Sequence, residues 1–230
     1  TECAQAHLFE REIAEQWNIV PDDHPWLKPI RGGTTKFFSM SGDEMHEVAV
    51  GPVHAGIIEP GHFRFQCHGE NVYHLEIALG YQHRGIEKAL IGGPNKRTLH
   101  YMETLAGDTT IGHALAYAQT FEALSRSRVS ARAHALRGIA LELERLANHV
   151  GDLGALAHDI GFLPTSSYCG RLRGDFLNST ALICGNRFGR SLVQPGGVNF
   201  DLEPSRITEM QQCLKKAERD VKNAVELLWN

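Results

Sequence analysis

The feature that most constrains the fold is a long helical pattern between residues 131 and 162. The segment ARAHALRGIALELERLANHVGDLGALAHDIGF repeats apolar residues at intervals of three and four, and one stripe carries Leu143, Leu146, Val150 and Leu153. Such a stripe must be covered by other apolar surface, so the pattern predicts a helix bundle. With 230 residues, 42% of them hydrophobic, the chain is long enough to bury this core.

Other helical segments flank this one. The apolar, Glu-rich pattern of residues 6–19 predicts a first helix. A proline-rich segment follows it and is expected to be extended. Residues 101–125 repeat apolar residues with helical spacing, and RLRGDFLNSTALICGNRFG predicts a shorter helix that ends at Gly185. The stretch QPGGVNFDLEP is expected to form a loop, and Pro204 is expected to begin the last helix.

Residues 46–79 alternate apolar and polar side chains instead. The pattern predicts three short strands, in HEVAVGPVH, GHFRFQCHG and NVYHLEIAL. A tight-turn signal, HGEN, lies between the last two. These strands fit a small antiparallel sheet with one face in water. The expected fold class is therefore α+β, a small antiparallel β-sheet followed by a helix bundle.

The chain is expected to divide into four regions: an N-terminal region at 1–33, a linker at 34–44, the antiparallel sheet at 45–80 and the bundle at 81–230. Gly32-Gly33 and the polar run to Asp43 mark the linker. Because the chain starts at Thr1 and its last helical pattern reaches Asn230 without a capping glycine, we expect a fragment with an incomplete bundle, truncated at the C-terminus.

Composition argues against several classes of function. The net charge of −4 offers no basic surface for nucleic acid. No run approaches the ~18 apolar residues of a membrane span, and we expect no signal peptide. The five cysteines are odd in number, widely spread and never spaced as Cys-x-x-Cys, which indicates reduced thiols and no thiolate zinc or iron–sulfur site.

Two groups of ionisable residues surround the start of the helical part. In GPVHAGIIEPGHFRF, His54, Glu59 and His62 lie around a glycine- and proline-rich turn that could approach a ligand, or the histidines could simply be exposed. In GYQHRGIEK, Arg84 and Glu87 could line a site or form an ordinary surface pair.

A third group, AGDTTIGHALAY, precedes a predicted helix. Asp108, Thr109 and Thr110 could cap that helix with their side-chain oxygens, which would explain them without any function. His113 falls inside the helix and would face either the core or a cavity.

Two further groups lie on the long helices. LELERLANHVGDLGALAHD carries Glu142, Glu144, Arg145, His149, Asp152 and His158. A solvated face explains most of them, but a lone acid or base on the apolar face would have a shifted pKa suited to proton relay. In CGRLRGDFLNSTALICGNRFGR, arginine–aspartate pairs could tie the bundle together. The residues alone leave open an oxidoreductase-like or a scaffold domain.

Taken in order, these motifs resemble the large subunit of nickel–iron hydrogenases over about residues 45–230. They are most similar to its membrane-bound, energy-converting branch, including formate hydrogenlyase, and to the related subunit that helps form the quinone site of respiratory complex I. Residues 1–33 resemble the end of a smaller complex I subunit that some hydrogenases fuse to the large one. The resemblance implies the hydrogenase large-subunit or complex I fold.

The family carries the motif Arg-x-Cys-Gly-x-Cys-x-x-x-His. When its His is aligned with His113, Thr104 corresponds to the Arg of the motif, and Ala106 and Thr109 correspond to its two cysteines. Alanine and threonine supply no thiolate, so the resemblance implies that no nickel–iron site is present. The family's quinone-contacting Tyr falls on Gly107, and its quinone-contacting His corresponds to His54 or His62. This departure resembles hydrogenase-related complexes that lack the nickel ligands.

The resemblance implies a core subunit of a membrane-associated oxidoreductase complex with a metal-free cavity. The cavity would be lined by Asp108 and His113 as catalytic residues and by His54, His62, Thr109 and Arg84 as binding residues. Further catalytic groups, Glu87 and His149 with Glu144 and Asp152, would couple reduction to proton movement. The fragment alone is expected to be inactive.

The expected cofactors and partners follow from the same resemblance. They are a quinone or related acceptor, an iron–sulfur partner subunit of complex I or hydrogenase type, a membrane channel-like subunit and NADH- or ferredoxin-oxidising subunits, at the cytoplasmic face of the membrane. A non-catalytic scaffold subunit is an alternative, and an intact nickel–iron hydrogenase is a weaker one.

Overall fold

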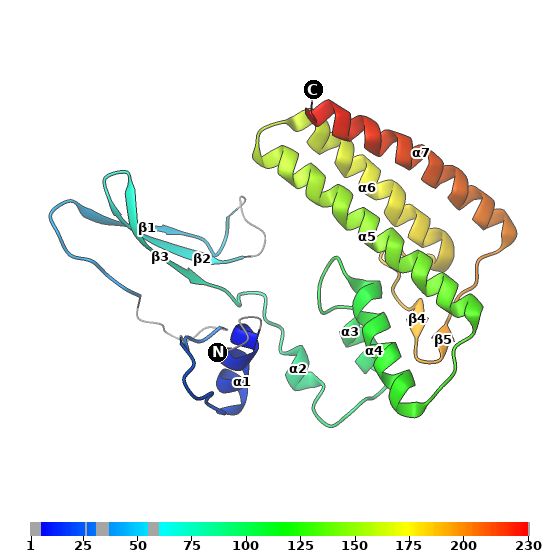
Figure 1. The fold of residues 1–230 in the computed structure, drawn as a ribbon, viewed down its shortest axis with the longest axis horizontal. Coiled ribbons are helices and arrows are strands. Elements are labelled where there is room, and N and C mark those ends of the chain that lie inside the picture. Colours follow the sequence, from blue (N-terminus) through cyan, green and yellow to red (C-terminus); the bar gives the residue numbers. More distant parts are fainter. Residues whose placement is uncertain (1–5, 26, 31–36, 55–59, 230) are drawn as a thin grey trace. The chain divides into compact units, whose positions relative to one another are not determined.

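The structure is a computed structural model that describes residues 6–25, 27–30, 37–54 and 60–229. The chain divides into two compact units, Thr1–Gly85 and Ile86–Asn230, and each is described by itself. The first contains a three-stranded sheet and the second a helical bundle (Figure 1). The predicted α+β class, with the sheet before the bundle, is confirmed.

The sheet of the first unit contains strands β1 (Met45–Val50), β2 (His62–His68) and β3 (Asn71–Ala78). They are antiparallel and adjacent in chain order. A two-residue turn joins β2 to β3, and its Gly69 has a φ of 56°, a conformation that glycine adopts without strain. The turn predicted at HGEN is therefore confirmed.

Helix α1 (His7–Trp17) is tied to the sheet through residues 28–30. Arg11 donates from Nε to the carbonyl of Lys28 at 2.5 Å, and the amide of Ile30 donates to Glu15 at 2.7 Å. The Lys28 ammonium then pairs with the Glu76 carboxylate of β3 at 3.0 Å. Side chains therefore link the N-terminal helix to the sheet within this unit.

One sheet face carries polar side chains, but it is not the wet face that the alternation suggests. The extended segment 37–40 crosses it, and the amides of Phe38 and Met40 donate to Glu76 at 2.7 Å and to Gln66 at 3.3 Å. Gln66 is only 3% exposed. Side chains of the sheet therefore accept the amides of this segment in place of a fourth strand.

The second unit is a bundle of long helices. Its elements are α2 (Ile86–Ala89), α3 (Thr98–Met102), α4 (Thr110–Ser125), α5 (Ala131–Asp159), α6 (Leu163–Cys184), the hairpin of β4 (Val193–Gln194) and β5 (Gly197–Val198), and α7 (Pro204–Trp229). Helix α6 packs against both α5 and α7 (Figure 1). The predicted end of α6 at Gly185 is confirmed, and so is the start of α7 at Pro204.

Three local predictions need correction. Residues 101–125 do not form one helix, because α3 stops at Met102 and α4 starts only after Gly107 and Asp108, which favour turns. Helix α6 starts at Leu163, earlier than expected, with a proline in its first turn. The expected QPGGV loop is a short hairpin, whose turn includes Gly196 at a φ of 90°.

The core lies between α4, α5 and α6. On α5 the buried stripe runs through Leu143, Ala147 and Val150, while Leu146 lies at its edge and is 36% exposed, contrary to the predicted stripe. Gly154 lets α6 approach closely, since a Cβ there would be 3.0 Å from that of Cys169. None of the helices in the described residues has both the length and the apolar composition to cross a membrane.

Candidate functional site

The first turn of α4 follows Ala106 and Thr109, the two positions that the resemblance aligns with the cysteines of the family motif. Thr109 occupies the N-cap position, but its side chain makes no capping hydrogen bond. The side-chain cap expected from Asp108, Thr109 and Thr110 is therefore not formed, and the first amides of α4 need another acceptor.

Glu144 of α5 is that acceptor. The amide of Ile111 donates to its Oε2 at 2.7 Å and the amide of Gly112 donates to its Oε1 at 3.0 Å, and the amide of Thr110 also bonds it. Gly112 leaves room for this contact, because a Cβ there would be 2.8 Å from the Thr109 Cγ2 and 3.4 Å from Glu144 Oε1. A carboxylate at a helix N-terminus also has a favourable interaction with the helix dipole.

Burial raises the pKa of Glu144. The residue is 9% exposed, and the nearby charge of Asp108 acts in the same direction, while the three amide hydrogen bonds act against it. Glu144 is thus the one member of the predicted group of six ionisable residues on α5 that is buried. The other ionisable residues of this group, Glu142, Arg145, His149, Asp152 and His158, are all exposed.

Asp108, just before α4, is fixed by the next two helices. Arg173 of α6 donates to its carboxylate at 2.7 Å, and Asn148 of α5 donates to its backbone carbonyl at 3.1 Å. The Arg173 side chain passes over Gly151, where a Cβ would be 3.2 Å from its Cδ. Three side chains, Glu144, Asn148 and Arg173, therefore hold the turn that carries the Asp-Thr-Thr sequence.

These residues line a small pocket, which we call the α4 pocket. Its lining consists of Asp108, Ile111, Glu144, Ala147, Asn148, Arg173, Leu177, Thr180, Arg187 and Phe188. Its volume of 10 Å³ is about that needed by one water molecule. The chemistry offered is two guanidinium groups, two carboxyls and one amide beside an apolar wall.

The loop after α6 closes this pocket. Asn186 accepts the amides of Phe188 and Arg190 at 2.9 and 3.3 Å, and Glu103 accepts the amide of Ser191 at 2.5 Å. Gly189 has a φ of 71°, and a Cβ there would be 2.3 Å from Ile111 Cδ1. Glu103 and Asn148 were missed from the sequence, because neither lies in a pattern that points to the start of α4.

A second buried carboxylate lies toward the other end of α4. Glu122 pairs with Arg137 of α5 through both oxygens, at 2.6 and 3.1 Å, and accepts the amide of Gly196 at 2.7 Å. Arg137, 1% exposed, also donates to the carbonyls of Gln194 and Gly197. The guanidinium of Arg137 lowers the pKa of Glu122. This pair fixes the β4–β5 hairpin.

The histidines predicted as binding residues lie in the first unit. His62 is hydrogen-bonded through Nδ1 to the carbonyl of Gly51 at 3.0 Å, and the His54 ring lies 5.7 Å from that of Phe63. Glu59 lies outside the described residues. Asp108 and His113 belong to the second unit, so a cavity that these residues share remains a prediction.

The remaining predicted site residues do not meet in one described pocket. Arg84 and Glu87 are exposed on either side of the boundary between the two units. His113 and Thr109 are half-buried in the first turn of α4 and just before it, and His149 is exposed on α5. Their roles stay predictions.

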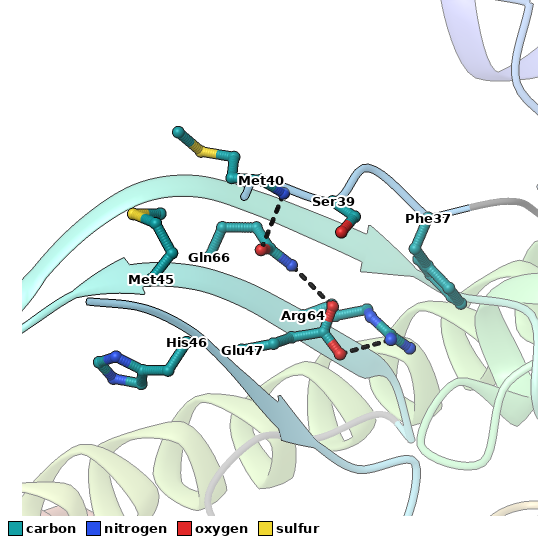
Figure 2. A pocket seen from close by; sticks show the side chains of 8 residues that line it. All are labelled: Phe37, Ser39, Met40, Met45, His46, Glu47, Arg64 and Gln66. Carbon is teal, nitrogen blue, oxygen red and sulfur yellow. Dashed lines mark hydrogen bonds and ion pairs between the residues drawn. The ribbon is translucent and has the colours of Figure 1, made fainter. Parts of the chain in front are cut away.

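A larger pocket, which we call the sheet pocket, lies on the polar side of the first unit's sheet (Figure 2). It has a volume of 470 Å³. In Figure 2, Gln66 bridges Met40 and Glu47, and Glu47 pairs with Arg64, which lowers the pKa of Glu47. Arg64 in turn lies over the Phe37 ring at 4.6 Å. The Glu47 and Arg64 side chains of the sheet pocket are therefore already paired with each other.

The residues present do not fit a nickel–iron centre. Soft metals of this kind need thiolates, and the two aligned positions hold Ala106 and Thr109. Within the described ranges, no group of three or more His, Cys, Asp or Glu side chains could hold a metal ion. That the site works without metal remains a prediction.

Comparison with known proteins supports the family resemblance. Residues 159–230 match the family model of the respiratory-chain NADH dehydrogenase 49 kDa subunit. Hydrogenase-4 component G of Escherichia coli K12 is 30% identical over 95% of this chain, and formate hydrogenlyase subunit 5 of the same strain is 29% identical over 95%. The chain is therefore similar to members of the superfamily of hydrogenase and complex I large subunits. The resemblance seen in its motifs is confirmed.

The fold agrees with this superfamily. A chain of the membrane-bound sulfane sulfur reductase, an archaeal respiratory membrane complex, superposes with a TM-score of 0.74 at 18% identity, over 80% of this chain and 49% of that one. The chain spans less than half the length of its Escherichia coli relatives, 45% and 44%.

Proposed function

We propose that the chain is a core subunit of a membrane-associated, complex I-like oxidoreductase complex. In this role the start of α4 shapes a metal-free cavity beside the iron–sulfur cluster of a partner subunit. The observation that carries the proposal is the start of α4 itself: Ala106 and Thr109 stand where the superfamily's thiolates would be, and Arg173 and Asn148 bond Asp108, whose side chain is 67% exposed.

Electrons would arrive from NADH, ferredoxin or another donor through that iron–sulfur subunit. A membrane channel-like subunit would be the second partner, and the chain would lie peripherally on the cytoplasmic face of the membrane. His54, His62, Thr109 and Arg84 would contact the acceptor, with Asp108 and His113 near the reacting atoms. Glu87, Glu144, His149 and Asp152 would supply protons.

The acceptor is a quinone or a related electron acceptor. A small polar acceptor, such as the sulfane sulfur in the name of the archaeal structural relative, is a second candidate. One observation favours it: Gly107 stands where the family's quinone-contacting Tyr would be.

The test uses the full-length subunit purified in its complex, with the iron–sulfur partner reduced by a viologen dye. Acceptor reduction and proton uptake are measured with a soluble quinone and with polysulfide. Asp108→Ala and His62→Ala should each abolish coupled turnover while leaving the complex assembled. Asp175→Ala is the matched control, because it removes an arginine-paired aspartate of α6 that does not line the α4 pocket.

Normal turnover in both the Asp108 and the His62 variants would contradict the proposal. It would instead support a scaffold that holds the cluster subunit against a membrane partner. Stoichiometric nickel in the purified complex, with hydrogen evolution, would support an intact hydrogenase.

A further inference from the structure

We propose that Glu144 is a proton-controlled positioning residue, whose carboxylate holds the first turn of α4, and with it Asp108 and Thr109, only while it is ionised. This inference rests on the proposed function for its purpose, because the turn it holds is the one that shapes the cavity. The contacts that carry it belong to this chain alone.

The hydrogen bonds explain why ionisation matters. The two oxygens of Glu144 accept from different amides, Ile111 at 2.7 Å and Gly112 at 3.0 Å. An ionised carboxylate accepts through both oxygens, whereas a protonated one carries a hydroxyl donor on one of them. Each oxygen accepts at least one amide, so a proton on either oxygen removes the negative charge that strengthens these bonds. Protonation therefore weakens the hold of Glu144 on the first turn of α4.

The space around the carboxyl group keeps it at this position. A Cβ at Gly112 would be in van der Waals contact with Oε1 at 3.4 Å, and the carboxyl reaches the amides from α5, a separate helix. The Asp-Thr-Thr side chains supply no cap of their own. When Glu144 releases the amides, no described side chain of the turn replaces it.

The charged groups near Glu144 do not neutralise its carboxylate. Asp108 before α4, Arg173 on α6 and Arg187 in the loop after α6 face the same pocket. Arg173 is paired with Asp108 at 2.7 Å, and among the described residues no cation forms an ion pair with Glu144. Burial without a counter-ion favours the neutral carboxyl, as the raised pKa of Glu144 indicates.

The consequence is a link between charge in the cavity and the shape of its wall. A negative charge that develops on a reduced acceptor raises the proton affinity of a nearby carboxyl. Glu144 would then take up one proton from solvent. This forms one O–H bond, and no other covalent bond is formed or broken. The first turn of α4 would loosen, which would change the position of Asp108 between Arg173 and Asn148.

Amide hydrogen exchange of the full-length subunit tests this directly. Protection factors of the amides of residues 111 and 112, corrected for intrinsic exchange, are measured from pH 5 to 9, with those of residues 114–118 as the internal reference. Protection should fall as the pH is lowered through the pKa of Glu144. Glu144→Gln should lower it by about tenfold at high pH and remove the pH dependence.

Glu142→Gln is the matched control, because Glu142 lies two residues away on α5 and pairs with Arg145 at the surface. It should leave both protection and its pH dependence unchanged. Equal protection in wild type and Glu144→Gln, or wild-type protection that does not vary with pH, would overturn the inference. The wild-type series decides the question even if the variant does not fold.

Because exchange needs no turnover, this result is separable from the proposed function. A pH-dependent turn together with normal turnover of the Asp108 and His62 variants would reject the proposed function and keep the role of Glu144. A turn insensitive to pH together with inactive Asp108 and His62 variants would do the reverse.

Discussion

Two buried glutamates lie at opposite ends of α4, Glu122 on α4 itself and Glu144 on α5, and they differ in what pairs with the carboxylate. Glu122 lies against Arg137, whose guanidinium lowers its pKa. Glu144 lies against backbone amides with no cation bonded to it, and burial raises its pKa. Both contacts join the same two helices: Arg137 of α5 bonds Glu122 of α4, and the amides of α4 bond Glu144 of α5.

The comparison separates a carboxylate that stabilises from one that binds protons. A buried charge with a bidentate partner and satisfied hydrogen bonds stays ionised and fixes structure. A buried charge without a counter-ion changes protonation when its surroundings change. The Glu122 end of α4 thus anchors the β4–β5 hairpin, and the Glu144 end is suited to respond to chemistry in the α4 pocket.

The largest expected effect is at the Glu122 end. Arg137→Ala should lower the free energy of unfolding by about 3–5 kcal/mol, because it leaves a buried carboxylate and two carbonyls without their donor. Urea unfolding followed by circular dichroism measures this. Arg145→Ala, which breaks an exposed pair, should cost only about 0–1 kcal/mol.

Replacing both partners sharpens the same prediction. The double variant Glu122→Leu, Arg137→Met removes the charges together, so it should be more stable than Arg137→Ala alone. A double variant as unstable as the single one would show that the hydrogen bonds to the hairpin, and not the buried charge, dominate.

The sequence predicted the class and order of the elements because periodicity reports which face of each element is buried. It also pointed to a group of six ionisable residues on α5 that includes Glu144, without showing which of them is buried. It did not reveal that Glu144 caps a helix that starts 34 positions earlier at Thr110, since local patterns carry no information on which distant helices meet. The side-chain cap expected from Asp108–Thr110 was wrong for the same reason.

A smaller effect is expected at Gly112. Gly112→Ala should destabilise the chain by about 1–3 kcal/mol, because the new methyl would lie 2.8 Å from Thr109 Cγ2. Gly138→Ala on α5 is the control: a Cβ there contacts nothing within 4 Å, so it should stabilise the helix by about 0.5–1 kcal/mol. If Gly112→Ala were also stabilising, the close approach of Thr109 to Gly112 would be refuted.

The smallest expected effect is on the pH dependence of stability. The pKa of Glu144 is raised by folding, so the native state binds more protons in that range and stability falls as pH rises through it. The pKa of Glu122 is lowered, so its contribution is lost as pH falls through its native pKa. In urea unfolding at several pH values, Glu144→Gln should remove the loss of stability with rising pH. Glu122→Gln should remove the loss of stability with falling pH.

The most direct measurement is the titration of the Glu144 carboxyl carbon in the full-length subunit, by carbon-13 NMR with labelled glutamate and assignment from Glu144→Gln. The account predicts a midpoint above the usual range of glutamate, and a midpoint for Glu122 below it. A Glu144 carboxyl that titrates at or below the usual glutamate value would contradict the account, because the start of α4 would then hold a permanently ionised cap.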